Sequence, residues 1–203
     1  MSRGYSLSTS KPGIWANHSG EGFMDIAKLS ELGIRNVYSV FGRGVRGETL
    51  ARGCHMGQAL EGVKAAGVRT IIDLRTADHN DKLCRRCFDL GIGYLHVPTD
   101  AKTMGSEELA VTLPTLFDAI DGNGFYLSCQ QGLHRTDIAL ALYFFYHDDQ
   151  EVPQMIGHRT KGYLRCDDIM RRTNAMRSFF PEMDNVLFEE RRKRFLAFNR
   201  KFQ

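Results

Sequence analysis

The sequence predicts an α/β fold, with a central, mostly parallel sheet of four to five strands flanked by helices. Three observations support this prediction. Short segments rich in β-branched and aromatic residues alternate with longer segments of helical pattern. Several helical segments end in glycine, which is a natural helix stop. Alternating strands and helices need crossover connections, and these place helices on both faces of a parallel sheet.

Four segments are predicted as strands, namely residues 34–40, 68–74, 93–97 and 125–129. The glycine-rich segment GRGVRG, residues 42–47, does not have the spacing of a dinucleotide-binding loop. We interpret it as a flexible basic loop, in which Arg43 or Arg46 could contact a second acidic group of a substrate.

Helical patterns occupy the intervals between these strands, at residues 57–67, 81–91 and 106–122. Pro114 is a point at which the third helix could be interrupted. A strongly apolar helix is predicted over residues 135–149, packed against the sheet centre, and at least one more helix within residues 166–180.

Size and composition favour a single domain over residues 1–203. The chain is long enough for one hydrophobic core and short for two domains. Hydrophobic residues make up 42% and charged residues 25%, so neither a disordered nor a fibrous chain is favoured. We expect a core over about residues 34–180, an irregular N-terminal arm over residues 1–20, and a basic amphipathic helix over residues 184–202.

In that last helix, Phe188, Phe195 and Phe202 recur every seven residues beside a run of basic residues. The favoured interpretation is a helix that docks on its own domain or on a second copy of the chain. Attachment to an acidic membrane surface is the alternative.

Charge, hydropathy and cysteine content limit the expected partners. A net charge of +3 is too small to predict nucleic-acid binding. No apolar run approaches the roughly 18–20 residues that span a bilayer, and the first residues lack the apolar middle of a signal peptide. We therefore expect a cytoplasmic protein without stable membrane insertion. The five cysteines have irregular spacing and do not predict a disulfide framework.

The segment LSCQQGLHRTD, residues 127–137, is the predicted catalytic site. Cys129 ends the fourth strand, and ligands of open α/β sheets bind beyond the carboxyl ends of the strands. Backbone amides of the loop and the positive end of the following helix dipole can surround an anion. Gly132 permits a tight turn, and Arg135 can bind two phosphate oxygens through its planar guanidinium.

The same electrostatic field lowers the pKa of a thiol, and the thiolate is the reactive form. Thr136 could donate its hydroxyl to the sulfur of Cys129. Five residues would line the phosphate site: Gln130, Gln131, Gly132, Leu133 and His134. An inert core cysteine that precedes a helix is the alternative.

The pattern Cys-x5-Arg-Thr, with a glycine in its middle, resembles the signature of the protein tyrosine phosphatase superfamily of cysteine phosphatases. The segments VRTIIDLR, residues 68–75, and LGIGYLHVPTD, residues 90–100, look like the small dual-specificity type, particularly its atypical microbial members. The resemblance covers about residues 34–150. It implies a cysteine-phosphatase-like fold, attack of Cys129 on phosphorus, and hydrolysis of the resulting phosphocysteine, with no cofactor and no metal.

The resemblance also implies an upstream aspartate that protonates the leaving oxygen and later activates water. Asp100, 29 residues before Cys129, fits this role. Its alternative role is that of a turn-forming residue after Thr99, and Asp78 is the second candidate. Two residues depart from the family pattern. Ser128 stands where histidine is usual, and Asp137 stands where glycine is usual.

Asp137 favours the helix dipole but would repel a phosphate dianion unless its side chain points away. The sequence thus predicts a protein tyrosine or dual-specificity phosphatase, acting on a phosphorylated protein or a small phosphomonoester. The alternatives are an inositol phosphate or phosphoinositide phosphatase, and a phosphate-binding pseudophosphatase. Loop lysines, common in the inositol phosphate enzymes, do not occur between Cys129 and Arg135. The physiological substrate and the oligomeric state are left open.

Cys84 and Cys87 have the spacing of half a zinc site, for which Cys54 and His55 could supply the other half. A helix with one buried and one partly exposed thiol is the favoured interpretation. A sulfur-transfer or arsenate-reducing enzyme, in which one of these thiols forms a disulfide with Cys129, is a further alternative.

Overall fold

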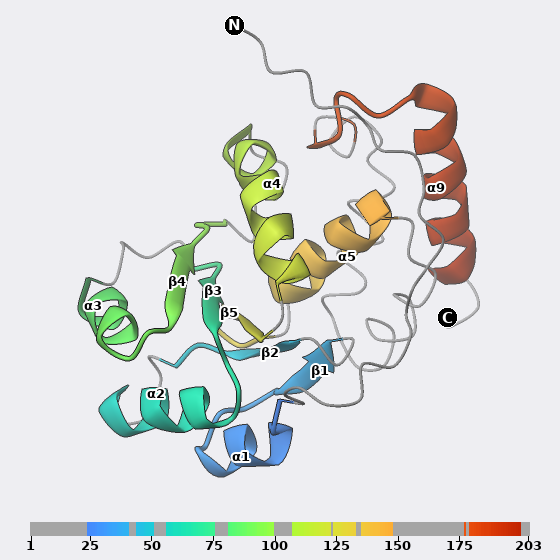
Figure 1. Ribbon diagram of the computed structural model, residues 1–203. Helices are drawn as coiled ribbons and strands as arrows, with labels where there is room; N and C mark the ends of the chain where they lie inside the picture. The colour runs from blue at the N-terminus through green and yellow to red at the C-terminus, as the bar shows by residue number, and fades with distance from the viewer. Residues whose placement is uncertain are drawn as a thin grey trace, which may run out of the picture.

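The computed structural model describes residues 24–40, 44–50, 56–75, 81–99, 107–122, 124–132, 135–147, 177 and 179–199. These residues form a five-stranded sheet of order β1-β2-β5-β3-β4, with helices on both faces (Figure 1). The strands are β1 Tyr38–Val40, β2 Gly44–Glu48, β3 Thr70–Asp73, β4 Gly93–His96 and β5 Phe125–Cys129. Only β1 is antiparallel to its neighbour. The predicted α/β fold with a mostly parallel sheet is confirmed.

One strand was not predicted, and the interpretation of residues 44–47 as a flexible loop is wrong. These residues belong to β2, which pairs with β1 and with β5, and every residue of β2 is buried. Glycine is needed at Gly44, because a Cβ atom there would lie 2.5 Å from the ring of Phe125. The first predicted strand is also shorter than expected, since only Tyr38–Val40 of residues 34–40 pairs with a neighbour.

The helices are α1 Ile26–Glu31, α2 Met56–Ala65, α3 Asp81–Asp89, α4 Glu107–Asp121, α5 Arg135–His147 and α9 Asn185–Asn199. Five of them, α2 to α5 and α9, confirm predicted helices, and Pro114 lies inside α4 without ending it. Helix α1 was not predicted; Asp25 caps it by accepting a hydrogen bond from the backbone N–H of Lys28. Residues 1–20, and residues 166–176 of the expected further helix, lie outside the described part of the chain.

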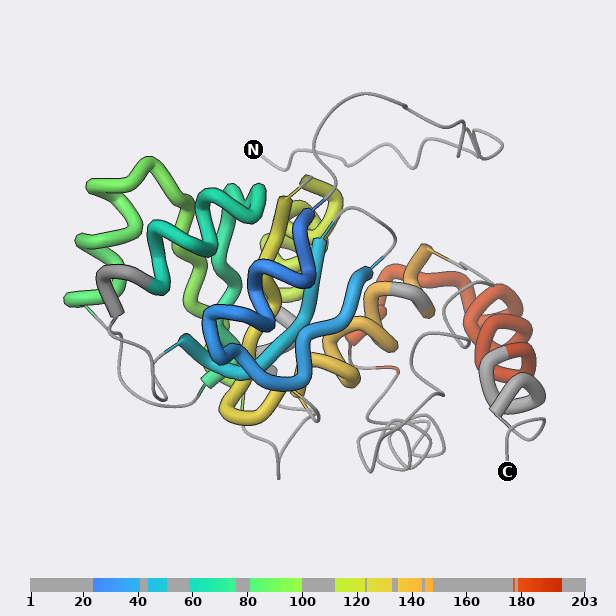
Figure 2. Tube along the Cα trace, turned by 90° about the horizontal axis from the view of Figure 1, so that it is seen from below, coloured from blue at the N-terminus to red at the C-terminus, as the bar shows by residue number. Residues whose placement is uncertain are grey.

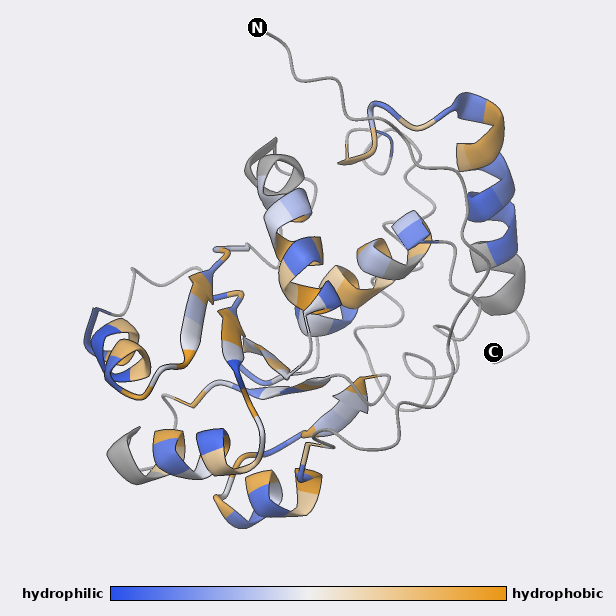
Figure 3. Ribbon diagram, viewed as in Figure 1, coloured by the Kyte–Doolittle hydropathy of each residue, from blue (hydrophilic) through white to orange (hydrophobic). Residues whose placement is uncertain are grey.

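Two apolar clusters cover the two faces of the sheet. Neighbouring residues of a strand point to opposite faces, so Ile71 and Tyr126 belong to the cluster under α1, α2 and α3. Ile72 and Leu127 belong to the cluster under α4 and α5. Figure 3 shows hydrophobic and hydrophilic residues on different sides of α3, as this arrangement requires. The central strands are therefore covered on both faces, which fits their apolar sequences.

The C-terminal helix α9 lies beside α5 in two perpendicular views (Figures 1 and 2). Phe188 is buried, with its ring centroid 5.3 Å from that of Phe145. Arg191 donates hydrogen bonds to the backbone oxygens of Phe145 and Tyr146, at the end of α5. Over its first half, α9 thus docks on its own chain. No helix in the described ranges is long and apolar enough to span a bilayer.

Candidate active site

Cys129 is the last residue of β5, which lies between β2 and β3. In the sheet register it stands opposite Glu48, while Ser128 stands opposite Asp73. The connections that follow β2 and β3 lead to helices on one face, whereas β5 leads to α5 on the other face. Diverging connections of this kind make a switch point, where α/β sheets bind ligands. The nucleophile predicted from the sequence therefore lies where the topology favours a site.

The chain after Cys129 turns sharply at Gly132. Its φ angle is 66°, a conformation that glycine adopts at no steric cost. A Cβ atom at this position would lie 2.3 Å from the carbonyl carbon of Gly47 and 2.6 Å from the backbone nitrogen of Glu48. Both the turn and the close approach to β2 thus require a glycine.

Side chains from the segment before β1 and from β2 bind this turn from one side. Asn36 donates from Nδ2 to the backbone oxygen of Gln131 at 2.9 Å. Arg46, buried in β2, donates from Nη1 to the backbone oxygen of Gly132 at 3.2 Å and forms an ion pair with Asp137. Its guanidinium carbon also lies 4.8 Å from the ring centroid of Tyr38. The expectation that Arg46 contacts substrate is wrong, because its guanidinium is bound within the protein.

The contacts of Arg46 explain why Asp137 is tolerated in the first turn of α5. The carboxylate is fully buried and its charge is compensated by Arg46, so it is directed at β2. Ser128, the second departure from the family pattern, is also buried. Its hydroxyl donates to the backbone oxygen of Ile72 at 3.2 Å. Both departures therefore have a structural role.

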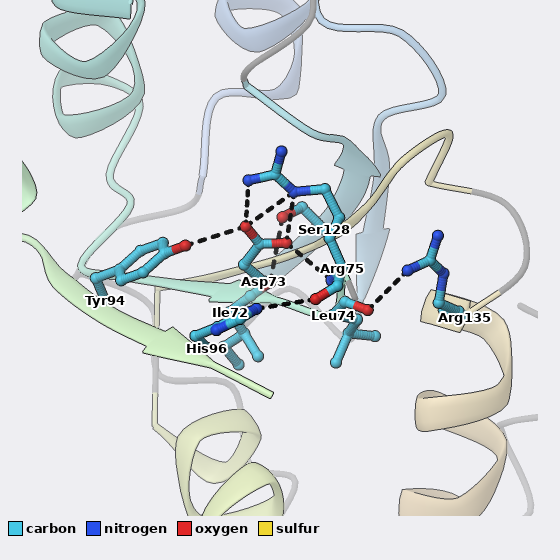
Figure 4. Close-up of polar contacts among 8 residues, drawn as sticks. All are labelled: Ile72, Asp73, Leu74, Arg75, Tyr94, His96, Ser128 and Arg135. Carbon is cyan, nitrogen blue, oxygen red and sulfur yellow. Dashed lines mark hydrogen bonds and ion pairs between the residues drawn. The ribbon is translucent and has the colours of Figure 1, made fainter. Parts of the chain in front are cut away.

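Arg135 begins α5 and extends toward β3. Its Nη1 donates to the backbone oxygen of Leu74 at 3.0 Å (Figure 4). The same nitrogen donates to the backbone oxygen of Thr99 at 3.3 Å. These two carbonyls follow β3 and β4, so the guanidinium lies at the carboxyl ends of the strands. A guanidinium has five N–H donors, and two bonds from one nitrogen leave donors that can bind a phosphate group.

A polar cluster that the sequence analysis missed holds the chain just after β3 (Figure 4). Asp73 accepts hydrogen bonds from Nε and Nη2 of Arg75 and, at 3.1 Å, from the hydroxyl of Tyr94. The hydrogen bond to Asp73 raises the pKa of Arg75, and burial raises the pKa of Tyr94 above its ordinary value. His96 Nε2 lies 2.8 Å from the backbone oxygen of Arg75. An acidic residue at the end of a strand, followed two residues later by a basic one, as in IIDLR, was the available signal.

The remaining predicted residues are only partly described. Gln130 and Gln131 are exposed, and the hydroxyl of Thr136 is fully buried with no hydrogen-bond partner among the described residues. The predicted bond from this hydroxyl to the sulfur of Cys129 is not formed in the structure, although both residues are described. Four candidates lie outside the described residues: Asp78, Asp100, Leu133 and His134. Arg43, Cys54 and His55 lie there too.

Cys129, Cys84 and Cys87 are all reduced thiols. Cys87 is buried in the cluster under α1, α2 and α3, whereas Cys129 belongs to the cluster on the other face of the sheet. Burial raises the pKa of Cys87 to about 11, and Cys84 adds a smaller effect. This environment makes the thiol of Cys87 unreactive at neutral pH. Within the described ranges, no group of three or more His, Cys, Asp or Glu side chains is arranged to hold a metal ion.

No protein-family model and no curated protein matches the chain. Several solved structures are similar to it. TpbA from P. aeruginosa is 17% identical with a TM-score of 0.48, over 77% of this chain and 90% of TpbA. Human DUSP28 is 16% identical with a TM-score of 0.43, over 79% and 92%. Tk-PTP in its active form is 16% identical with a TM-score of 0.45, over 80% and 97%.

Proposed function

We propose that this protein is a phosphomonoester hydrolase in which Cys129 is the nucleophile. The observation that carries the proposal is the position of Cys129 at the carboxyl end of the central strand, followed by the turn at Gly132 and the start of α5 at Arg135. A helix N-terminus and a guanidinium beside a thiol favour the binding of an anion and the thiolate form of the cysteine.

In the first step, Arg135 and the backbone amides of residues 130–134 bind the phosphate oxygens. The thiolate of Cys129 attacks phosphorus, and the bond from phosphorus to the leaving oxygen breaks as Asp100 gives that oxygen a proton. The product is a phosphocysteine. Donors that bind the developing charge lower the barrier most when they are already in place before the reaction.

In the second step, water attacks phosphorus and the sulfur–phosphorus bond breaks. Asp100, now a carboxylate, takes a proton from the water, which returns the thiolate and releases inorganic phosphate. Neither step needs a metal or a cofactor. Gln130, Gln131, Leu133 and His134 would line the entrance and contact the rest of the substrate.

We expect singly phosphorylated substrates in the cytoplasm, first of all phosphotyrosine in proteins, and phosphoserine or phosphothreonine if the pocket is shallow. The ion pair between Arg46 and Asp137 supports this expectation, because it occupies a cation that could otherwise bind a second phosphate group. Inositol polyphosphates and phosphoinositides carry more negative charge, which the absence of lysine between Cys129 and Arg135 disfavours. They remain the alternative substrate class.

A pseudophosphatase is the second candidate function, and Ser128 and Asp137 are the reason for it. The contacts of these residues weaken that reason. Asp137 is paired with Arg46, and Ser128 donates to Ile72 within the sheet. The hydrolase is therefore the better supported proposal.

Hydrolysis by the purified protein tests the proposal directly. Rates on an aryl phosphate between about pH 5 and 8, on phosphotyrosine peptides, on phosphoinositides and on inositol polyphosphates are compared with those of Cys129→Ser. We expect the highest rates on the aryl phosphate and phosphotyrosine peptides. Phosphate binding without any Cys129-dependent hydrolysis would instead support the pseudophosphatase. Asp100→Asn should lower kcat by about 10²- to 10⁴-fold if Asp100 is the acid.

A further inference from the structure

We propose that Arg46 is a positioning residue, which holds the turn at Gly132 and the first turn of α5 in the arrangement that binds phosphate. The inference rests on the proposed function and names a residue outside the phosphatase motif. Arg46 lies in β2, a strand that ends beside Cys129 in the sheet register.

The guanidinium of Arg46 joins the turn at Gly132 to the first turn of α5. Arg46 Nη1 donates to the backbone oxygen of Gly132, before the helix, and forms an ion pair with Asp137, inside the first turn of the helix. All of Asp137 and nearly all of Arg46 are buried. Water screens such a buried ion pair little, so the pair constrains the positions of the Gly132 turn and of the start of α5.

The orientation of the peptide planes gives this contact a consequence for binding. In a trans peptide, the N–H points away from the C=O of the same unit. Asn36 binds the backbone oxygen of Gln131, and Arg46 binds that of Gly132. The peptide unit that joins Gln131 to Gly132 therefore directs the N–H group of Gly132 away from Asn36. Amide groups that are oriented in advance bind an anion without a further ordering cost.

The identity of the two charged residues also fits this role. Asp137 stabilises the start of α5 through the helix dipole, but an uncompensated carboxylate there would repel phosphate. Arg46 compensates that charge and binds a carbonyl with the same planar group, whereas lysine is a point charge on a flexible stem. The ring of Tyr38 lies 4.8 Å from the guanidinium carbon. The guanidinium is therefore fixed on three sides.

The test compares a charge-neutral double variant with a variant that keeps the charge. Arg46→Met with Asp137→Leu removes both charges and the bond to Gly132. Arg46→Lys keeps the charge without the planar fork. Phe188→Leu, in α9, serves as a destabilised control remote from the loop. Each protein is measured for its Kd for inorganic phosphate, its kcat and KM on an aryl phosphate, and its Tm.

We expect the double variant to fold with a Tm close to that of the parent, because apolar replacement of both partners of a buried pair is often neutral. Its phosphate affinity and kcat/KM should fall by about 10- to 100-fold, the order expected for a displaced binding group. The phosphate affinity and kcat/KM of Arg46→Lys should lie between those of the parent and those of the double variant. Phe188→Leu should have a lower Tm and an unchanged Kd for phosphate.

A double variant that binds phosphate and turns over substrate like the parent would overturn the inference and leave the proposed function intact. If the double variant does not fold, Arg46→Lys decides, since binding equal to that of the parent would overturn the inference. A parent protein that neither binds phosphate nor shows Cys129-dependent hydrolysis would overturn both proposals. The two failures are thus distinguishable.

Discussion

The loop that follows β5 is held differently on its two sides. On the β2 side, the side chains of Arg46 and Asn36 bind carbonyls of the loop itself, and Gly132 packs against the backbone of β2. On the β3 side, Arg135 reaches out of the loop region to the backbone oxygens of Leu74 and Thr99.

This difference indicates which contacts depend on particular residues. Every residue has a backbone carbonyl, so the partners of Arg135 are present whenever β3 and β4 end at this edge of the sheet. The contacts on the β2 side depend on the side chains of Arg46, Asp137 and Asn36, and on Gly132, where the missing Cβ atom allows close approach to β2. Substitutions on the β2 side should therefore disturb the conformation of the loop and lower the free energy of unfolding of the protein. Substitutions of Arg135 should act mainly on activity.

The largest effect should follow from Arg46→Met alone. It leaves the buried carboxylate of Asp137 without its cation, which we expect to cost about 3–5 kcal/mol of unfolding free energy. Urea unfolding measures this loss. Arg35→Met is the matched control, because Arg35 also pairs with a buried carboxylate, Glu48, but its own side chain is 71% exposed. An equal loss for both variants would contradict the distinction between the two pairs.

On the β3 side, Arg135→Lys should lower kcat/KM by about 10²- to 10³-fold, because one fixed donor to the phosphate is lost. The unfolding free energy should change little, since Arg135 is only half-buried and a lysine ammonium keeps the charge and N–H donors for the carbonyls of Leu74 and Thr99. Steady-state kinetics and urea unfolding of the same preparation check both statements. Unchanged kinetics would show that Arg135 does not bind the substrate.

Gly132 and Gly91 have the same φ angle, so alanine substitutions at the two positions distinguish backbone strain from steric contact of the added Cβ atom. Gly132 and Gly91 both have a φ of 66°, but a Cβ atom would meet the backbone of β2 at Gly132 and nothing within 4 Å at Gly91. Gly91→Ala should cost about 1–2 kcal/mol, the cost of the left-handed conformation. Gly132→Ala should cost more, about 2–3 kcal/mol, and should also weaken phosphate binding. Equal losses of stability would mean that contact with β2 is unimportant.

The smallest effect concerns the cluster after β3. Tyr94→Phe removes the hydrogen bond to Asp73 and should cost about 0.5–1.5 kcal/mol at neutral pH. Burial raises the pKa of Tyr94 above its ordinary value of 10.0, so the unfolded chain loses this proton at a lower pH than the folded protein. The contribution to stability is therefore present below pH 10 and falls as the pH rises further.

Urea midpoints of the parent and of Tyr94→Phe, measured at several pH values, test the sign of this dependence. Cys87 titrates in a similar range but is present in both proteins, so the difference between them isolates Tyr94. We expect the two midpoints to converge as the pH rises above 10. A difference that grows with pH would contradict the raised pKa.

The comparison also explains what could be predicted from the sequence. Strands β3, β4 and β5 have the composition of buried strands, and Cys129, Gly132 and Arg135 belong to a motif with regular spacing. Strand β2 was missed because GVRGE contains two glycines and two charged residues. The charge of its Arg46 is compensated in the core by Asp137, which is 91 residues away. Asp137 was recognised as a conflict with the motif, but its partner could be found only in three dimensions.

The central claim, nucleophilic attack by Cys129, is tested most directly by trapping its product. The protein is quenched rapidly during turnover of an aryl phosphate, and the peptide that contains residue 129 is analysed by mass spectrometry. We predict a phosphate group covalently bound to Cys129, and none on the corresponding peptide of Cys129→Ser. Sustained hydrolysis without any modified Cys129, or with activity retained in Cys129→Ser, would contradict the account.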